Sequence, residues 1–365
     1  MPEILNFFKL RRGGLDWLLV GGLIIFAAAS LVSLASSNFK FFSRQLIWYV
    51  FSFIIIIFGS RLHWRWFLAQ PWFRFGLYWF SVTLLVVSNL QSKTIRGTKS
   101  WLVLGPVQFE PSELAKLALI FVLAGFFSRR YLAAWRGKNI FVSLGFALVP
   151  AVLTAIHPDF GSAAVIMGIW LGFLLVSGIN YKRLAVGLLI ATTIAVLLWS
   201  FFLKDYQKDR LSAFLFPESD PLGINYNVIQ SKIAIGSAGF WGKGFGAGTQ
   251  TQLGFLPEVQ SDFLFAAFIE EWGIFGGVLL ILTFLFIIFR IIGIGLRAKS
   301  NDFKFVSLGA GLVFTIHFFI NVGSNLGLVP VAGVTFPFLS YGGSSLLTGS
   351  ILISIIQHIK IESSF

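Results

Sequence analysis

The chain of 365 residues contains no cysteine, which excludes disulfides, thiolate nucleophiles and cysteine-based metal sites. Its four histidines are scattered, and no zinc, metalloprotease or nucleophile-elbow signature is present. Charged residues make up only 12% of the chain, against 56% hydrophobic residues and a mean hydropathy of +0.84. A soluble globule could not bury so much apolar surface. Lipid must therefore be the main solvent of this protein.

Apolar runs of roughly 18 or more residues recur along the chain, and each is long enough to cross a bilayer as a helix. The sequence predicts an all-α polytopic membrane bundle of about ten helices, forming a single domain over residues 1–365. A long extracytoplasmic loop, 204–261, follows the seventh helix. The first run is too long for a signal peptide and is followed by further spans, so it is interpreted as a retained helix. The predicted helices are 15–36, 45–60, 71–90, 112–128, 139–156, 161–179, 184–203, 262–289, 304–328 and 339–359.

The net charge is +13, from 28 Lys and Arg against 15 Asp and Glu. Because the cations lie in short clusters between apolar runs, they indicate orientation in a membrane and not binding to nucleic acid. An even number of spans places both termini in the cytoplasm, and 17 of the 28 cations then fall on the cytoplasmic side. These 17 are Lys9, Arg11, Arg12, Arg61, Arg65, Arg74, Arg129, Arg130, Arg136, Lys138, Lys182, Arg183, Arg290, Arg297, Lys299, Lys304 and Lys360.

The carboxylates show the opposite bias, since eleven of the fifteen fall on the outer side or in the outward halves of helices. A charged side chain at membrane depth costs about 3 kcal/mol, so such residues normally face a protein-lined or wet cavity. The sequence therefore predicts a cavity of mixed charge that opens outward. The eleven are Glu110, Glu113, Asp159, Asp205, Asp209, Glu218, Asp220, Glu258, Asp262, Glu270 and Glu271.

Glu113 and Lys116 stand three positions apart at the start of the fourth predicted helix, within one turn on the same face. One interpretation is a structural ion pair that lets both charges enter the membrane. The other is that the pair lines the predicted cavity.

Two further acids stand at predicted helix starts. Asp159 follows Pro158 at the head of the sixth helix, in the position of a helix cap. Ser261 or Asp262 could cap the eighth helix in the same way. Glu270 lies about two turns beyond Asp262, which gives two carboxylates on neighbouring faces of one membrane helix and favours a functional role there.

The glycine-rich run Gly236–Gln250 invites comparison with a phosphate-binding loop. It fails the Walker pattern, because Gly244 follows Lys243 where Ser or Thr is required. Its Gly-x-Gly-x-x-Ala match lacks the preceding strand of a dinucleotide site. A re-entrant or surface loop whose backbone N–H groups and Lys243 approach a phosphate is still compatible with the run.

Long motifs in a fixed order carry a resemblance to a known family. They are RGTKSWLVLGPVQFEPSELAK (96–116), HPDFGSA (157–163), the stretch 206–273, and GLVPVAGVTFPFLSYGGSS (327–345). The chain resembles the SEDS family of bacterial cell-wall proteins over most of its length. Within this family, the sequences GTQ (248–250) and FLPE (255–258), which precede SDF (261–263), resemble the proteins of cell elongation more than those of cell division. Small departures occur at Glu110 and His157, where the family usually has Gln, and at Ser261, where it usually has Thr.

The resemblance implies a peptidoglycan glycosyltransferase that polymerises lipid II outside the cytoplasmic (inner) membrane. Its implied partners are a class B penicillin-binding protein and other membrane proteins of the elongation complex. It implies Asp262 as the catalytic carboxylate, with Glu113, Lys116, Asp159 and Arg210 lining the substrate cavity. The sequence predicts no cofactor or metal site, and it does not show whether a divalent ion such as magnesium or manganese assists.

The mechanistic hypothesis is that Asp262 takes the proton of the acceptor hydroxyl, while Lys116, Arg210, Arg96 and Lys243 stabilise the leaving diphosphate. Three alternatives stay open at this point. A lipid II flippase would need a polar path through both leaflets. An ion-coupled transporter would need charges near the bilayer midplane, and a scaffold would need no chemistry.

Overall fold

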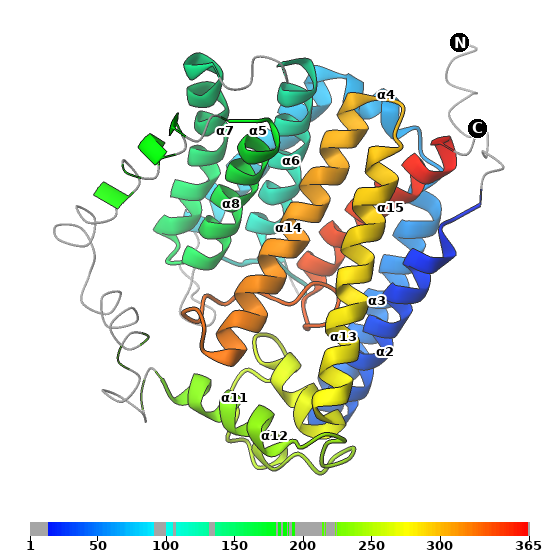
Figure 1. The fold of residues 1–365 in the computed structure, drawn as a ribbon, viewed down its shortest axis with the longest axis vertical. Coiled ribbons are helices and arrows are strands. Elements are labelled where there is room, and N and C mark those ends of the chain that lie inside the picture. Colours follow the sequence, from blue (N-terminus) through cyan, green and yellow to red (C-terminus); the bar gives the residue numbers. More distant parts are fainter. Residues whose placement is uncertain are drawn as a thin grey trace.

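The structure, a computed structural model, describes residues 14–90, 100–104, 107–130, 136–179 and 225–363, together with short pieces at 182–183, 185–187, 189, 192–193, 214, 216 and 223. The described chain is a bundle of helices with one antiparallel hairpin, which pairs Leu102 with Phe109 (Figure 1). The elements are α2 (Trp17–Ser37), α3 (Phe39–Gly59), α4 (Trp64–Ala69), α5 (Pro71–Leu90), β1 (Leu102–Leu104), β2 (Val107–Phe109), α6 (Pro111–Arg130), α7 (Gly137–Ile156), α8 (Phe160–Val176), α11 (Tyr226–Ser237), α12 (Thr249–Gln252), α13 (Leu264–Leu296), α14 (Asn301–Leu326) and α15 (Gly343–Ser363).

The all-α membrane fold that the sequence predicts is confirmed. Eight described helices are long and apolar enough to cross a membrane, and α8, with 17 residues, stands at the lower limit of such a length. These nine correspond to nine of the ten predicted helices. The tenth, 184–203, lies largely outside the described residues. Hydropathy missed α4, α11, α12 and the hairpin, because these elements are short or polar.

Large apolar side chains point outward from the helices that surround the bundle. Trp17, Phe58, Trp79, Phe141 and Phe289 are among the exposed ones. In water such a surface would be an aggregation hazard, whereas in a bilayer it is the surface that contacts lipid.

Helix α6 forms the centre of the bundle. It packs against α5, α7, α8, α14 and α15, and nearly every residue from Ser112 to Ser128 is buried. A helix buried on all sides contacts little lipid, so the charged pair that it carries at Glu113 and Lys116 lies inside the protein.

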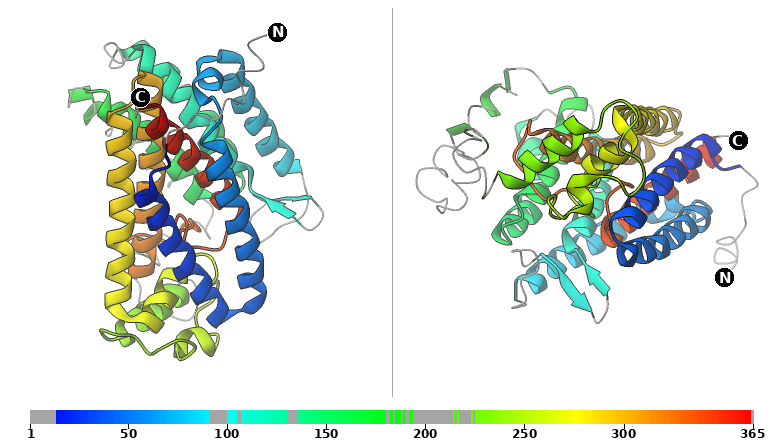
Figure 2. Two further views of the ribbon diagram at one scale, coloured as in Figure 1. Left: turned by 90° about the vertical axis from the view of Figure 1, so that its right-hand side faces the viewer. Right: turned by 90° about the horizontal axis from the view of Figure 1, so that it is seen from below.

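Helices α11 and α12 cover one end of the bundle, as the view along its axis shows (Figure 2). At that end, part of the glycine-rich run Gly236–Gln250 packs against α13 at the point where this helix is interrupted. Gly273 has φ 76° and ψ 176°, so α13 consists of two helical pieces. The run closes the break with backbone hydrogen bonds: Lys243 N–H donates to Glu270 O over 3.0 Å, and Ile274 N–H donates to Gly239 O over 3.0 Å. Hydropathy gave no sign of this break, because apolar residues continue on both sides of Gly273.

Replacing Gly273 with alanine is expected to abolish accumulation of folded protein in the membrane. Its backbone conformation is essentially restricted to glycine, and an added Cβ would collide with the Phe240 carbonyl. Gly293 in the same helix has open space around its Cα, so Gly293→Ala is the matched control. Size-exclusion chromatography of detergent extracts measures both variants. A monodisperse Gly273→Ala protein in normal yield would contradict this account of the break.

Candidate active site

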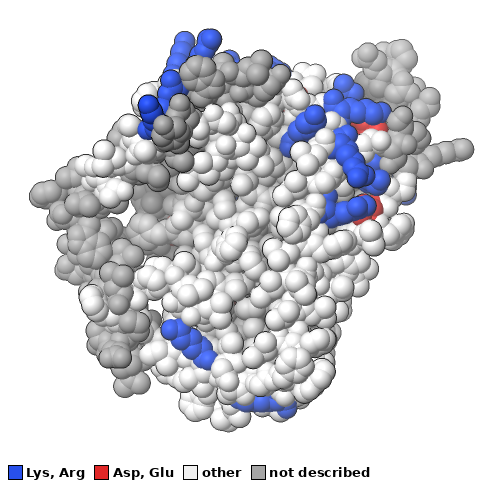
Figure 3. Space-filling view, in the orientation of Figure 1, with Lys and Arg blue, Asp and Glu red and all other residues white. Residues whose placement is uncertain are grey.

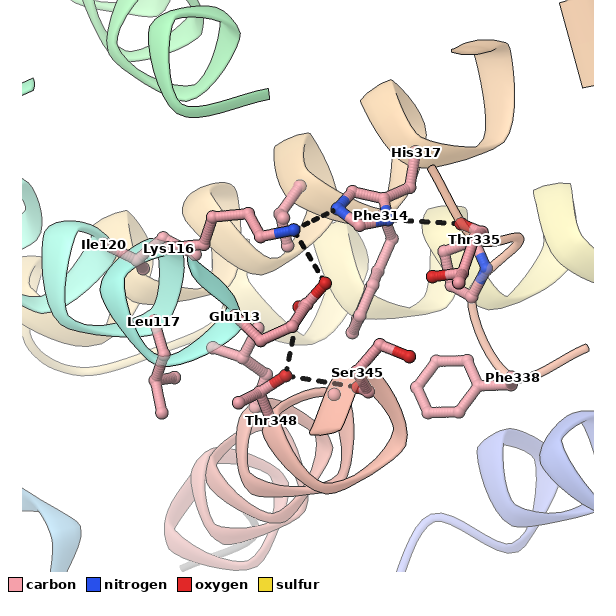
Figure 4. A pocket seen from close by; sticks show the side chains of 14 residues that line it. Glu113, Lys116, Leu117, Ile120, Phe314, His317, Thr335, Phe338, Ser345 and Thr348 are labelled. Carbon is pink, nitrogen blue, oxygen red and sulfur yellow. Dashed lines mark hydrogen bonds and ion pairs between the residues drawn. The ribbon is translucent and has the colours of Figure 1, made fainter. Parts of the chain in front are cut away.

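The predicted pair of Glu113 and Lys116 is confirmed as an ion pair. Lys116 Nζ lies 2.7 Å from Glu113 Oε1, and both side chains are buried. Thr348 of α15 donates its hydroxyl to the other carboxylate oxygen over 3.4 Å. Figure 4 shows the three side chains meeting from α6 and α15. The carboxylate therefore has partners for both of its oxygens.

His317 of α14 is the second partner of the lysine. Its Nε2 lies 3.1 Å from Lys116 Nζ, and its Nδ1 lies 3.2 Å from the carbonyl oxygen of Thr335 (Figure 4). A carbonyl oxygen only accepts, so Nδ1 carries the proton and Nε2 accepts from the ammonium. Two of the three N–H groups of Lys116 are thus directed at Glu113 and His317, which leaves one for a further acceptor.

A small cavity opens beside these residues. Its polar wall carries the Glu113 and Lys116 pair with His317, and its apolar wall carries side chains such as Phe314 and Phe338 (Figure 4). A cation beside an apolar wall suits a ligand that joins an anionic group to a hydrocarbon chain. Sequence reasoning did not single out His317, because its partner Lys116 lies 201 positions away.

Asp159 lies at the start of α8, where its carboxylate accepts the N–H of Ser162 over 3.0 Å. The capping interpretation of this residue is therefore confirmed. Glu110 lies close by, with its Oε1 accepting the hydroxyls of Ser112 over 2.5 Å and Ser162 over 3.5 Å. Burial, reinforced by the charges of Glu113 and Asp159, raises the pKa of Glu110 to about 8. Burial also raises the pKa of Asp159.

Glutamine in place of Glu110 is expected to make the protein more stable above neutral pH. The carboxyl has a pKa near 4.5 in the unfolded chain and about 8 in the folded protein. Between these values the unfolded chain releases the proton that the folded protein keeps, so stability falls as the pH rises through this window. Thermal unfolding in detergent at pH 5 and pH 8.5 should show a smaller loss of Tm in Glu110→Gln than in the wild type. Equal losses in both proteins would exclude Glu110 as the source.

Asp262 lies just before α13, and its backbone N–H donates to Glu258 O over 3.2 Å. The helix begins at Leu264, and its N-cap residue is Phe263, whose side chain makes no capping hydrogen bond. The expectation that Ser261 or Asp262 caps this helix is therefore wrong. Asp262 Oδ2 instead faces Gly333, lying 3.9 Å from the position that a Cβ there would occupy.

The segment 327–342, which connects α14 to α15, links three of the predicted residues. Its Gly333 faces the carboxylate of Asp262, and its Thr335 carbonyl binds His317, the partner of Lys116. Its Ala332 carbonyl packs directly on Gly161, two residues beyond Asp159. Residues 262, 116 and 159, far apart in sequence, therefore surround one connecting segment.

Lys243 takes part in a different cluster. Its ammonium binds Glu270 Oε1 at 2.9 Å, Ser237 Oγ at 2.8 Å and Thr249 Oγ1 at 2.9 Å, which uses all three N–H groups. Glu270 also accepts the N–H and the hydroxyl of Thr251 over 3.1 and 2.9 Å. The predicted contact between Lys243 and a diphosphate thus competes with an existing network. The same network binds Glu270, which with Glu271 is one of the two acids deep enough in the predicted helix for the transporter alternative.

Two predicted residues, Arg96 and Arg210, lie outside the described residues. Within the described ranges no group of three or more His, Asp or Glu side chains is arranged to hold a metal ion. The described part of the site comprises the Asp262 carboxylate, the Lys116 ammonium bound by Glu113 and His317, and a cavity with one apolar wall.

The chain is 34% identical to peptidoglycan glycosyltransferase MrdB of Escherichia coli strain K12 over 350 residues, which cover 95% of this chain and 94% of MrdB. It is 32% identical to probable peptidoglycan glycosyltransferase FtsW of Nitrosomonas europaea, covering 94% of this chain and 90% of that protein.

Solved structures show the same fold. A chain of a peptidoglycan synthase complex, described as coordinating polymerization and crosslinking, matches with a TM-score of 0.83 and 29% identity, covering 96% of this chain and 98% of that one. Rod shape determining protein RodA of Thermus thermophilus matches with a TM-score of 0.71 and 25% identity, covering 97% and 98%. A model of the FTSW_RODA_SPOVE cell cycle proteins matches residues 14–364. The chain therefore belongs to the FtsW/RodA/SpoVE family, as the SEDS motifs in its sequence predict.

Proposed function

We propose that this protein polymerises lipid II at the outer face of the cytoplasmic membrane, with Asp262 as the general base of an inverting glycosyl transfer. The activity class follows from the family: the chain is a peptidoglycan glycosyltransferase of cell elongation, similar to MrdB over nearly the whole length of both chains. The observation that supports the proposed mechanism is that two groups contact the same connecting segment. The Asp262 carboxylate faces it at Gly333, and His317, which binds the buried ammonium of Lys116, contacts it at the Thr335 carbonyl.

In the proposed reaction a GlcNAc hydroxyl of one lipid II attacks the anomeric carbon of a second. Asp262 accepts the hydroxyl proton as the new C–O bond forms and the bond to the diphosphate breaks. The Lys116 ammonium, held by Glu113 and His317, directs its remaining N–H at the diphosphate oxygen that gains charge. Arg96 and Arg210 are proposed as further cations for this anion. The apolar wall of the cavity would take the start of the polyprenyl chain.

A single displacement at an α-linked donor gives a β-linked product, with no covalent sugar intermediate. Glycan made by the purified protein from labelled lipid II should therefore be fully digested by lysozyme, which cleaves β-linked strands. A lysozyme-resistant α-linked polymer, or a sugar covalently attached to the protein, would contradict this mechanism.

We further propose that the end carrying α11 and α12 is extracytoplasmic and that both termini are cytoplasmic. Lys and Arg gather at the opposite end of the molecule, whereas few lie on the face near α11 (Figure 3). This is the distribution that the positive-inside rule gives for cytoplasmic loops. The cavity and Asp262 would then be reached from outside, where the proposed polymerisation of lipid II takes place.

Labelling of single cysteines tests this orientation, since the chain has no cysteine of its own. In intact spheroplasts a membrane-impermeant maleimide should label Phe245→Cys, at an exposed position beside α12. It should label Lys299→Cys, in the turn between α13 and α14, only after the membrane is opened. The reverse pattern would require the site to face the cytoplasm.

A class B penicillin-binding protein is the proposed partner. Its support is the structural match to a chain of a complex whose description names both polymerization and crosslinking. Co-purification of the full-length protein with that class of partner from the same cells tests this part of the proposal.

A further inference from the structure

One face of α14 carries three buried polar residues, His317, Asn321 and Asn325, spaced four positions apart. Residues at this spacing lie one above the other on a helix. Polar side chains inside a membrane helix are retained where they have partners to bind. The residues that bind this face of α14 include Lys116 and Asp262, the two groups that carry out the proposed reaction.

Asn325 is inserted into the first turn of α13. Its Nδ2 donates to the backbone carbonyl of Asp262 over 2.9 Å, and its Oδ1 accepts the N–H of Ala266 over 3.3 Å. In a regular helix the Ala266 N–H would bond directly to the Asp262 carbonyl. The Asn325 amide takes the place of that bond, and the first regular bond of α13 runs from Ala267 N–H to Phe263 O over 3.1 Å.

Asn321 binds the same carbonyl from the next turn of α14. Its Nδ2 donates to Asp262 O over 3.0 Å and to Val334 O over 2.9 Å. Val334 adjoins Gly333, the residue that faces the carboxylate of Asp262. One amide therefore fixes both the backbone that carries the carboxylate and the segment opposite it.

One turn further along the same face, His317 binds Lys116 Nζ and the Thr335 carbonyl. The face of α14 thus binds the backbone of Asp262, the ammonium of Lys116 and the connecting segment. We infer that Asn321 and Asn325 are positioning residues that aim the Asp262 carboxylate, with α14 setting its placement relative to Lys116. This inference rests on the proposed role of Asp262, and neither asparagine needs to touch substrate.

Leucine at position 325 tests the inference, since it has about the size of asparagine and forms no hydrogen bond. Misplacement of a reactive group by about 1 Å costs up to about 100-fold in rate. We expect kcat of lipid II polymerisation by the full-length protein to fall roughly 10- to 100-fold in Asn325→Leu, with KM changed less than about twofold. Inhibition by undecaprenyl diphosphate should be unchanged, because Lys116 is untouched.

Two further variants keep the test decisive. Asn325→Ser is the second variant, because its hydroxyl can bond back to the Asn321 carbonyl within α14 and so keep the fold, yet it is too short to reach Asp262. The control is Ser231→Ala, since Ser231 Oγ donates to the Asn325 carbonyl over 2.9 Å but has no bond to Asp262.

The expected result is a loss of kcat in both Asn325 variants and a normal kcat in Ser231→Ala, per folded molecule. A normal kcat in Asn325→Ser, an equal loss in Ser231→Ala, or a change confined to KM would overturn the inference. Each of these outcomes leaves an active wild type, so each is distinct from failure of the proposed function, in which the wild type makes no polymer or Asp262→Asn is fully active.

Discussion

Asp262→Asn is expected to fold normally and to make almost no glycan polymer. Asparagine has nearly the same shape as aspartate but cannot accept the proton of the acceptor hydroxyl. A positioned general base contributes about 100- to 10,000-fold in rate, so a loss of this size is expected in kcat. Polymerisation of labelled lipid II by the purified variant, resolved on a gel, measures it.

The fold should survive because α14 holds residue 262 through its backbone. Asn321 and Asn325 both donate to the carbonyl of residue 262, and the substitution leaves that carbonyl in place. Asp302→Asn makes the same chemical change in the first turn of α14, away from the cavity, and should retain activity. If Asp262→Asn polymerised lipid II as fast as Asp302→Asn, Asp262 would have no part in the chemistry.

Lys116→Met is expected to lose both activity and stability. Activity falls because the leaving diphosphate loses its cation, and stability falls because Glu113 loses its ion-pair partner. The substitution leaves the Glu113 carboxylate buried without its cation, which costs about 3–5 kcal/mol. The double variant Lys116→Met with Glu113→Gln carries no unpaired charge, so its folded yield should return toward the wild-type level. Its polymerisation rate should stay at least about 100-fold low, since no ammonium then faces the leaving group.

A second ion pair, between the buried Asp16 and the partly exposed Arg290, provides the control for this prediction. Arg290 Nη2 lies 2.6 Å from Asp16 Oδ2, joining α13 to the start of α2. Arg290→Met should lower the Tm but leave the rate per folded molecule unchanged. Recovery of polymerisation in the Lys116 and Glu113 double variant would show that the lysine only neutralises its neighbour.

Local patterns predicted those parts of the molecule that depend on neighbours in sequence. The lengths of the apolar runs predicted the nine described spans, and most predicted helix ends lie within a few residues of the observed ones. The three-residue spacing of Glu113 and Lys116 predicted their ion pair. The position of Asp159 directly before a predicted helix predicted its role as the helix cap. Each of these features is set by interactions within one or two turns.

Features set by distant contacts were not predictable in this way. The start of α13 moves past Asp262 because Asn325, 63 positions away, binds the Asp262 carbonyl and takes the Ala266 N–H. The break at Gly273 needs the backbone of residues 239–244 to close it. Lys243 looked available for phosphate because its partner Glu270 is 27 positions further on.

Direct observation of polymerisation tests the central claim most simply. Full-length protein, purified with the proposed penicillin-binding partner and incubated with fluorescent lipid II, should convert the lipid II into a ladder of glycan strands on a gel. The same preparation carrying Asp262→Asn should leave lipid II as monomer. Lipid II that crosses vesicle membranes in the presence of the wild-type protein without joining into strands would contradict the assignment and would support a flippase instead.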